Sequence, residues 1–192
     1  TESIRKRYYQ SLEAESYGGN KIDYKIKVGL IKGVGGVKVY SGHEWNGGGT
    51  VKIVITDSDF EKPTDTLVKS VQKDVATPGE GIGIAPIGHI VTVVGVNEVE
   101  IDISTQIIYQ PGYYFEAVKT DLEKAVDEYL QGLNSVWEDE SNIIVRISQL
   151  ETRILGVKGV LDVMNTTING VSENYTVHKD SIVKRGELTD GN

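Results

Sequence analysis

One seven-residue pattern occurs twice in this chain, and it limits what the chain can fold into. Residues 31–37 read I-K-G-V-G-G-V and residues 154–160 read I-L-G-V-K-G-V, so the pattern I-x-G-V-x-G-V recurs 123 positions later (31 against 154). In each copy a segment with helical spacing precedes the pattern, and a segment with strand-like alternation follows it. Glycine permits the left-handed backbone that ends many helices. The sequence therefore predicts two helix-to-strand joints, whose residues carry no chemically reactive side chain.

The two predicted joints have the same composition. We assign them six structural residues, Gly33, Val34 and Gly36 in the first copy and Gly156, Val157 and Gly159 in the second. Gly33 and Gly156 take the position after the helix end, where a left-handed residue is expected. A joint that is repeated without catalytic side chains favours a scaffold over an enzyme.

Periodicity around the joints predicts an α+β fold of mixed layers. Two helix-helix-strand-strand units form a pseudo-repeat on either side of a helix and a two-stranded β-ribbon, which divides the chain into 1–57, 58–111 and 112–192. Two unrelated joints are the alternative to duplication. The expected helices cover 3–14, 20–30, about 63–76, 115–133 and 143–154, and the expected strands cover 37–40, 50–56, 89–96, 99–109 and 160–168. A turn at Asn169-Gly170 leads into a return strand from Tyr175.

Composition excludes several classes of protein. With 39% hydrophobic and 25% charged residues, the 192-residue chain is neither disordered nor a membrane protein, and no apolar run approaches bilayer length. The net charge of −8 disfavours nucleic-acid binding, and the absence of cysteine excludes disulfides, zinc–thiolate sites and iron–sulfur clusters. The chain starts with Thr1 and its only methionine is Met164, so we expect it to be a piece of a longer protein.

The glycine clusters and the histidines do not form a recognisable cofactor or metal motif. A dinucleotide-binding loop needs G-x-G-x-x-G between a strand and the helix it opens, but Lys38 stands at the third glycine and the order here is helix then strand. His43, His89 and His178 lie far apart, without the spacing of a zinc motif. We predict no cofactor, no metal and no small-molecule substrate.

Two further groups of residues offer alternatives. Asp57, Asp59 and Glu61 could supply paired carboxylates, although a solvated acidic turn is the favoured interpretation. Trp45 and Trp137 lie in or beside polar breaks and could stack on sugar rings, although anchoring a loop or an interface is the commoner use of such residues.

The order of elements resembles the baseplate J-like proteins of contractile phage tails, most closely the XkdT-type branch of PBSX-like prophages. The resemblance rests on short motifs spread over nearly the whole chain. They include residues 3–9 and 19–21, Tyr24, residues 33–35, 37–39, 47–51 and 85–89, then Ile154, 156–157, 159–160, Asp162, Asn165 and 168–170. Members of this family are structural wedge subunits around the central hub, so the resemblance implies no catalytic residues.

We therefore predict a non-enzymatic, structural component of a phage or phage-like baseplate. Its implied partners are other baseplate and tail proteins and copies of itself in a ring, with no nucleic acid and no membrane insertion. It would assemble in the bacterial cytoplasm and then belong to the particle. Alternatives are a carbohydrate- or receptor-binding tail module using Trp45 or Trp137, and a cell-wall hydrolase using Asp57, Asp59 or Glu61.

Overall fold

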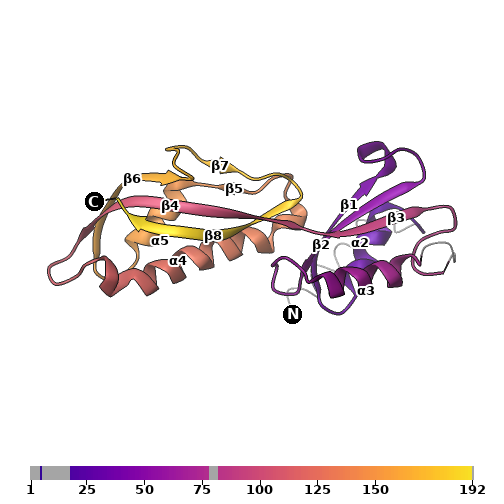
Figure 1. Cartoon of the computed structure of the whole chain (residues 1–192), viewed down its shortest axis with the longest axis horizontal. Helices are drawn as coiled ribbons and strands as arrows, with labels where there is room; N and C mark the ends of the chain where they lie inside the picture. The colour runs from indigo at the N-terminus through magenta and orange to yellow at the C-terminus, as the bar shows by residue number, and fades with distance from the viewer. Residues whose placement is uncertain (1–4, 6–17, 78–81, 192) are drawn as a thin grey trace. The chain divides into compact units, whose positions relative to one another are not determined.

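A computed structural model describes residue 5, residues 18–77 and residues 82–191. The helix expected at 3–14 lies outside these residues. The chain divides into two compact units, with the boundary between Val96 and Asn97 (Figure 1). This boundary falls inside the segment 58–111 that the sequence sets apart as a central region. The units are therefore described separately.

Within residues 18–77 and 82–96, the first unit combines two helices with a three-stranded sheet. Its elements are α2 (Lys21–Gly29), β1 (Val34–Ser41), the 3-10 turn η1 (Gly42–Glu44), β2 (Thr50–Asp57), α3 (Asp65–Val75) and β3 (Ile90–Gly95). The sheet has the order β1-β2-β3, with β2 antiparallel to β1 and parallel to β3. The β2–α3–β3 segment is thus a crossover unit, in which a helix connects two parallel strands.

Both helices of the first unit begin at polar caps, as their sequences predict. Asn20 accepts a hydrogen bond from the backbone N–H of Asp23 at 2.8 Å, and Thr64 accepts one from Leu67 at 3.3 Å. The helices share one core with the sheet. Its buried residues are Tyr24, Val28, Val37, Val51, Ile53, Ile55, Val71, Val75, Val91 and Val93.

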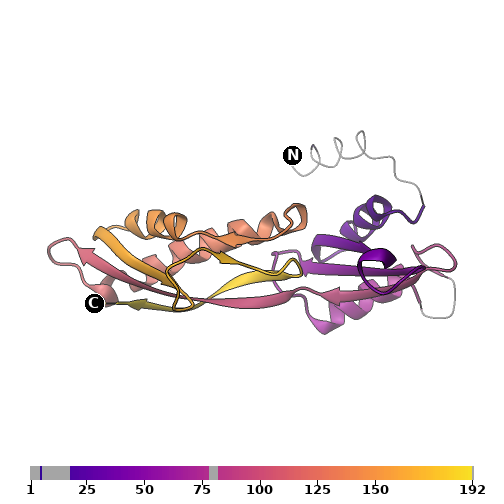
Figure 2. The same cartoon turned by 90° about the horizontal axis from the view of Figure 1, so that it is seen from above.

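The second unit contains β4 (Asn97–Tyr109), α4 (Phe115–Ser135), the 3-10 turn η2 (Trp137–Asp139), β5 (Ile144–Val145), α5 (Ile147–Leu155), β6 (Val160–Ile168), β7 (Tyr175–Thr176) and β8 (Ser181–Asp190). The main sheet has the order β6-β4-β8, with β4 antiparallel to β6 and parallel to β8. A small second sheet pairs β5 with β7. Figure 2 shows α4 and α5 together on one face of the main sheet.

The alternation of apolar and polar residues along 99–104 predicts a strand with one face in water, and β4 has such a face. Ile101, Ile103 and Ile107 are buried, whereas Glu100 and Asp102, on either side of Ile101, are exposed. The apolar stripe of α4 is also as expected, because Val118, Leu122, Val126 and Tyr129 all lie in the core. The predicted α+β class with mixed helices and strands is confirmed.

Two expectations about strand pairing are wrong, and one strand was not predicted. The strands at 89–96 and 99–109 exist, but they form no ribbon with each other, because β3 pairs with β2 and β4 pairs with β6 and β8. Asn169 and Gly170 form the predicted turn, with φ of 50° and 77°. Only the bridge between Ile168 and Val171 follows it, since β7 pairs with β5. The strand β8, which the sequence pattern did not predict, takes the sheet position beside β4.

The helix expected at 143–154 begins four residues later than predicted. Ile143 and Val145 are buried in or beside β5, so their apolar spacing belongs to a strand. The helix starts at Ile147, whose N–H donates to Oδ1 of Asn174 at 3.0 Å. A capping group 27 residues away in the chain therefore determines where α5 begins.

Candidate functional site: the joints, the capped sheet edges and the exposed surfaces

The first joint is a tight connection between α2 and β1. The helix ends with Leu30 as its cap, and Gly33 follows in a left-handed conformation with φ of 94°. Val34 opens β1, and the N–H of Gly36 donates to Oγ1 of Thr56 at 2.7 Å inside a bulge of that strand. Gly33 thus adopts the predicted left-handed conformation, although it stands three residues beyond the helix cap.

The second joint has the same shape but a different register. Gly156 caps α5 with a right-handed φ of −72°, so the left-handed conformation expected for Gly156 is wrong. The left-handed residue is Gly159, with φ of 98°, and β6 begins at Val160. Tyr113 packs so closely here that an added Cβ on Gly159 would lie 2.2 Å from its ring. Gly159, rather than Gly156, is where a side chain cannot be accommodated.

The two joints superimpose in sequence at an offset of 126 residues, not 123. In the first, the N–H groups of Ile31 and Val34 donate to the carbonyls of Val28 and Ile31 at 3.0 and 3.1 Å. In the second, the corresponding bonds join Val157 to Ile154 and Val160 to Val157, at the same two distances. The buried pair Tyr24 and Val28 then corresponds to Leu150 and Ile154. The repeated heptad letters are therefore three residues out of step with the repeated structure.

A second shared device lies at the sheet edges. In the first unit, the side-chain amide of Gln72 on α3 donates to the carbonyl of Val91 at 3.1 Å and accepts from the N–H of Val93 at 2.8 Å. In the second, Asn134 on α4 donates to the carbonyl of Val183 at 2.8 Å and accepts from its N–H at 3.0 Å. Both β3 and β8 are edge strands parallel to a central strand. Each thus has part of its outer edge hydrogen-bonded by a helix carboxamide, which sequence spacing alone did not reveal.

The three histidines have different surroundings. His43 is exposed in η1 and His178 is exposed in the second unit, where its Nδ1 accepts from the N–H of Asp180 at 3.3 Å. His89 shares a hydrogen bond of 2.8 Å with the hydroxyl of Tyr24. Burial, together with the neighbouring Asp23 carboxylate, raises the pKa of Tyr24 to about 12. Among the described residues, no group of three or more His, Cys, Asp or Glu side chains is arranged to hold a metal ion.

The acidic turn is organised by one of its own carboxylates. Oδ1 of Asp57 accepts from the N–H of Asp59 at 3.0 Å and from the N–H of Glu61 at 2.9 Å. The left-handed Phe60, with φ of 60°, lies between them. These are the contacts of a turn capped by a side chain, so Asp57 has a structural role in this turn.

The two tryptophans have different environments. Trp137 is 1% exposed and its indole N–H donates to the carbonyl of Lys179 at 3.0 Å, so the expectation that it could be an exposed sugar platform is wrong. Trp45 is 40% exposed, on the loop that follows η1. Ile87 and Ile90 are also exposed, and the N–H of Ile90 donates to Gly49 of the same η1–β2 loop. The first unit thus has an apolar, loop-built end.

The comparisons with known proteins match this two-unit architecture. The Baseplate J-like central domain matches residues 16–95, and the Baseplate J-like protein C-terminal domain matches residues 101–189. The chain therefore belongs to the Baseplate J-like family. The two matched segments lie on either side of the boundary between Val96 and Asn97.

Two curated relatives come from Bacillus subtilis (strain 168). The chain is 32% identical over 188 residues to the phage-like element PBSX protein XkdT, and 34% identical over 188 residues to the uncharacterized protein YqbT. Each match covers 97% of this chain and 52% of the relative, so the chain spans about half the length of both proteins.

A solved structure has a similar fold at low sequence identity. It is a cryo-EM structure of the anti-feeding prophage (AFP) baseplate, with 6-fold symmetry applied, in which one chain matches with a TM-score of 0.63 and 8% identity. The match covers 97% of this chain and 42% of that chain. In the part of this chain that the structure describes, no helix is long and apolar enough to span a bilayer.

Proposed function

We propose that this chain is part of a structural wedge subunit in the baseplate of a phage or phage-like contractile tail. The observation that carries the proposal is the pair of consecutive Baseplate J-like domains, which together account for both compact units. The subunit assembles in the bacterial cytoplasm with other baseplate and tail proteins and with copies of itself in a ring. It then remains in the particle.

Three of the side chains that could have supported other functions make structural contacts instead. Asp57 stabilises a turn, Trp137 is buried against a carbonyl, and His89 is hydrogen-bonded to a core tyrosine. The joints and the capped sheet edges keep each unit rigid without a ligand. Rigidity of this kind is what a subunit needs if it is to hold neighbours at fixed positions.

The test is deletion of the gene followed by electron microscopy of the particles. We expect tails without complete baseplates, restoration by the wild-type gene, and the protein itself in purified particles. Intact, active particles that lack the protein would refute the proposal.

One matched substitution separates the structural role from hydrolysis. Asp57→Asn retains the oxygen that accepts from Asp59 and Glu61 but removes the carboxylate. We expect this variant to restore assembly and activity fully. A particle that assembles normally but no longer degrades cell wall would instead support the hydrolase alternative.

A further inference from the structure

The helix-free face of the second unit's sheet changes character near one end. Along β4 this face carries Glu100, Asp102, Ser104 and Gln106 at alternate positions, as expected for a face in water. The next position on the same face is Ile108, which is 43% exposed. The strand continues to alternate between its two faces, but Ile108 is apolar whereas the four preceding residues on this face are polar.

The neighbouring strand places two more apolar side chains beside Ile108. In the register, Ile108 pairs with Asp162 and Gln106 pairs with Met164, so Ile108 and Met164 are diagonal neighbours. Leu161 is the extra residue in the irregularity where Ile108 and Tyr109 pair with Asp162 and Val160. Leu161 is 60% exposed and Met164 is 37% exposed. Ile108, Leu161 and Met164 are called the β4/β6 patch below.

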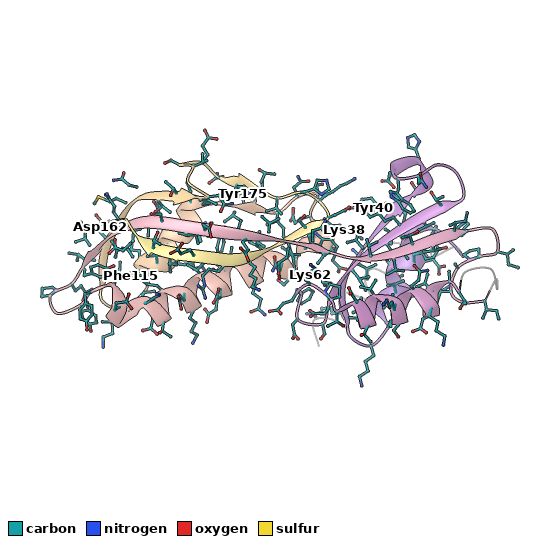
Figure 3. The ribbon with its side chains drawn as sticks, viewed as in Figure 1. Lys38, Tyr40, Lys62, Phe115, Asp162 and Tyr175 are labelled. Carbon is teal, nitrogen blue, oxygen red and sulfur yellow. The ribbon has the colours of Figure 1, made fainter. Side chains whose placement is uncertain are left out.

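The patch lies in a strongly acidic unit. From Asn97 to the end of the chain there are 17 Asp or Glu against 8 Lys or Arg, a formal balance of −9, whereas the residues before Asn97 have 11 against 12. The second unit thus carries −9 and the residues before it carry +1, which together give the net charge of −8. Asp162, which Figure 3 labels, is exposed, and it lies between Leu161 and Met164 in the sequence of β6. An apolar patch in a unit of this charge favours a positively charged partner surface over a negatively charged one.

The charge bears directly on which partner fits. Two copies that met through the same patch would bring two units of −9 together, which opposes association. A surface of opposite charge would gain from the same field, and its apolar side chains would cover the patch. We propose that the β4/β6 patch binds a different baseplate protein, through an apolar surface bordered by Lys or Arg. The proposal rests on the baseplate role proposed above.

The test places a photoreactive benzoylphenylalanine at Leu161 of the intact protein in assembled particles. After irradiation and proteolysis, mass spectrometry identifies the attached peptide. We expect a peptide of another baseplate protein that contains both apolar and Lys or Arg side chains. The same probe at Gln149, which is exposed on α5 away from this face, is the control and should not give that peptide.

A second variant tests the energetic role. Leu161→Asp adds charge to an apolar contact and should reduce incorporation into particles at least about tenfold, which corresponds to about 1.4 kcal/mol. Gln149→Asp adds the same charge outside the patch and should leave incorporation unchanged. Isolated Leu161→Asp should retain the wild-type circular dichroism spectrum and melting temperature, because Leu161 is already solvated.

The outcomes separate the two proposals. If the wild-type protein is absent from particles, the baseplate role fails and this inference fails with it. If the protein is present but the probe at Leu161 attaches to another copy of the same chain, to an acidic surface or to nothing, only the partner assignment is overturned. Normal incorporation of Leu161→Asp would overturn it as well.

Discussion

Replacing Asn134 by leucine tests the two hydrogen bonds between its carboxamide and the backbone of Val183. Asn134 is 6% exposed and Val183 is 2% exposed, and the carboxamide binds both backbone groups of Val183. Leucine has the same branching and the same number of heavy atoms but is somewhat larger and cannot hydrogen-bond. Asn134→Leu therefore leaves one N–H and one carbonyl buried without a partner, and it creates no large cavity.

The expected loss follows from two opposing contributions. Each orphaned backbone group costs about 1–3 kcal/mol, and the added apolar atoms of leucine return about 1–2 kcal/mol. For the two groups together the cost is about 2–6 kcal/mol, so the net loss in the free energy of unfolding is about 0–5 kcal/mol, with a midpoint of about 2.5 kcal/mol. Urea denaturation followed by the fluorescence of Trp137 measures it, because that indole is buried in the second unit and hydrogen-bonded to Lys179.

Hydrogen exchange supplies an independent measurement of the same contact. The amide of Val183 should exchange faster in Asn134→Leu than in the wild type. Gln131→Leu changes an exposed position of the same helix and should shift stability by less than about 0.5 kcal/mol. A loss below that value in Asn134→Leu, with the Val183 amide still protected, would refute the edge-capping role.

Three further predictions concern other contacts. Gln72→Met should destabilise the first unit by about 1–2 kcal/mol, less than the asparagine change because Gln72 is only partly buried; urea denaturation with an amide-exchange readout at β3 measures this. Gly159→Ala should cost at least about 2 kcal/mol in thermal or urea unfolding, because Gly159 has a φ of 98° and lies against a tyrosine ring. Gly156→Ala should be neutral within about 1 kcal/mol, because the nearest atom to the added Cβ would be 3.4 Å away. Equal effects of the two substitutions would contradict the 126-residue register. Hydrogen bonds from Lys21 and Ser41 lower the pKa of Glu44 to about 2. The stability that this contact contributes is therefore present above about pH 4.5 and is lost as the pH falls toward 2. NMR titration of Glu44, with Glu44→Gln as the control for assignment, measures the pKa, and a midpoint near 4.5 would contradict the contact.

The sequence predicted local structure well where one segment contains all of the information. The cap at Asn20, the stripe of α4 and the turn at Asn169-Gly170 follow from neighbouring residues, and the structure has all three. The partners of β3 and of β4 in their sheets could not be predicted in this way. Each of these strands finds partners far along the chain, and alternation does not identify a partner.

At the joints, the sequence motif predicts the repeated structure correctly but gives the wrong offset between the two copies. The letters of the heptad coincide at 123 residues because glycine and valine are common to both copies. The backbone instead repeats at 126, where Val28 corresponds to Ile154 and Gly33 to Gly159. The spacing Tyr24, Val28, Ile31 against Leu150, Ile154, Val157 was the available signal, because both sets step by four and then three.

The carboxamide caps of Gln72 and Asn134 have a consequence for a subunit crowded among many neighbours. An uncapped edge strand accepts any extended chain, and pairing of that kind does not close, so it can grow into a fibre. At β3 and β8, one N–H and one carbonyl of each outer edge are already bonded to a helix of the same unit. Each cap therefore blocks strand addition at one point of its edge, which lowers the tendency of the chain to grow into a fibre at high local concentration.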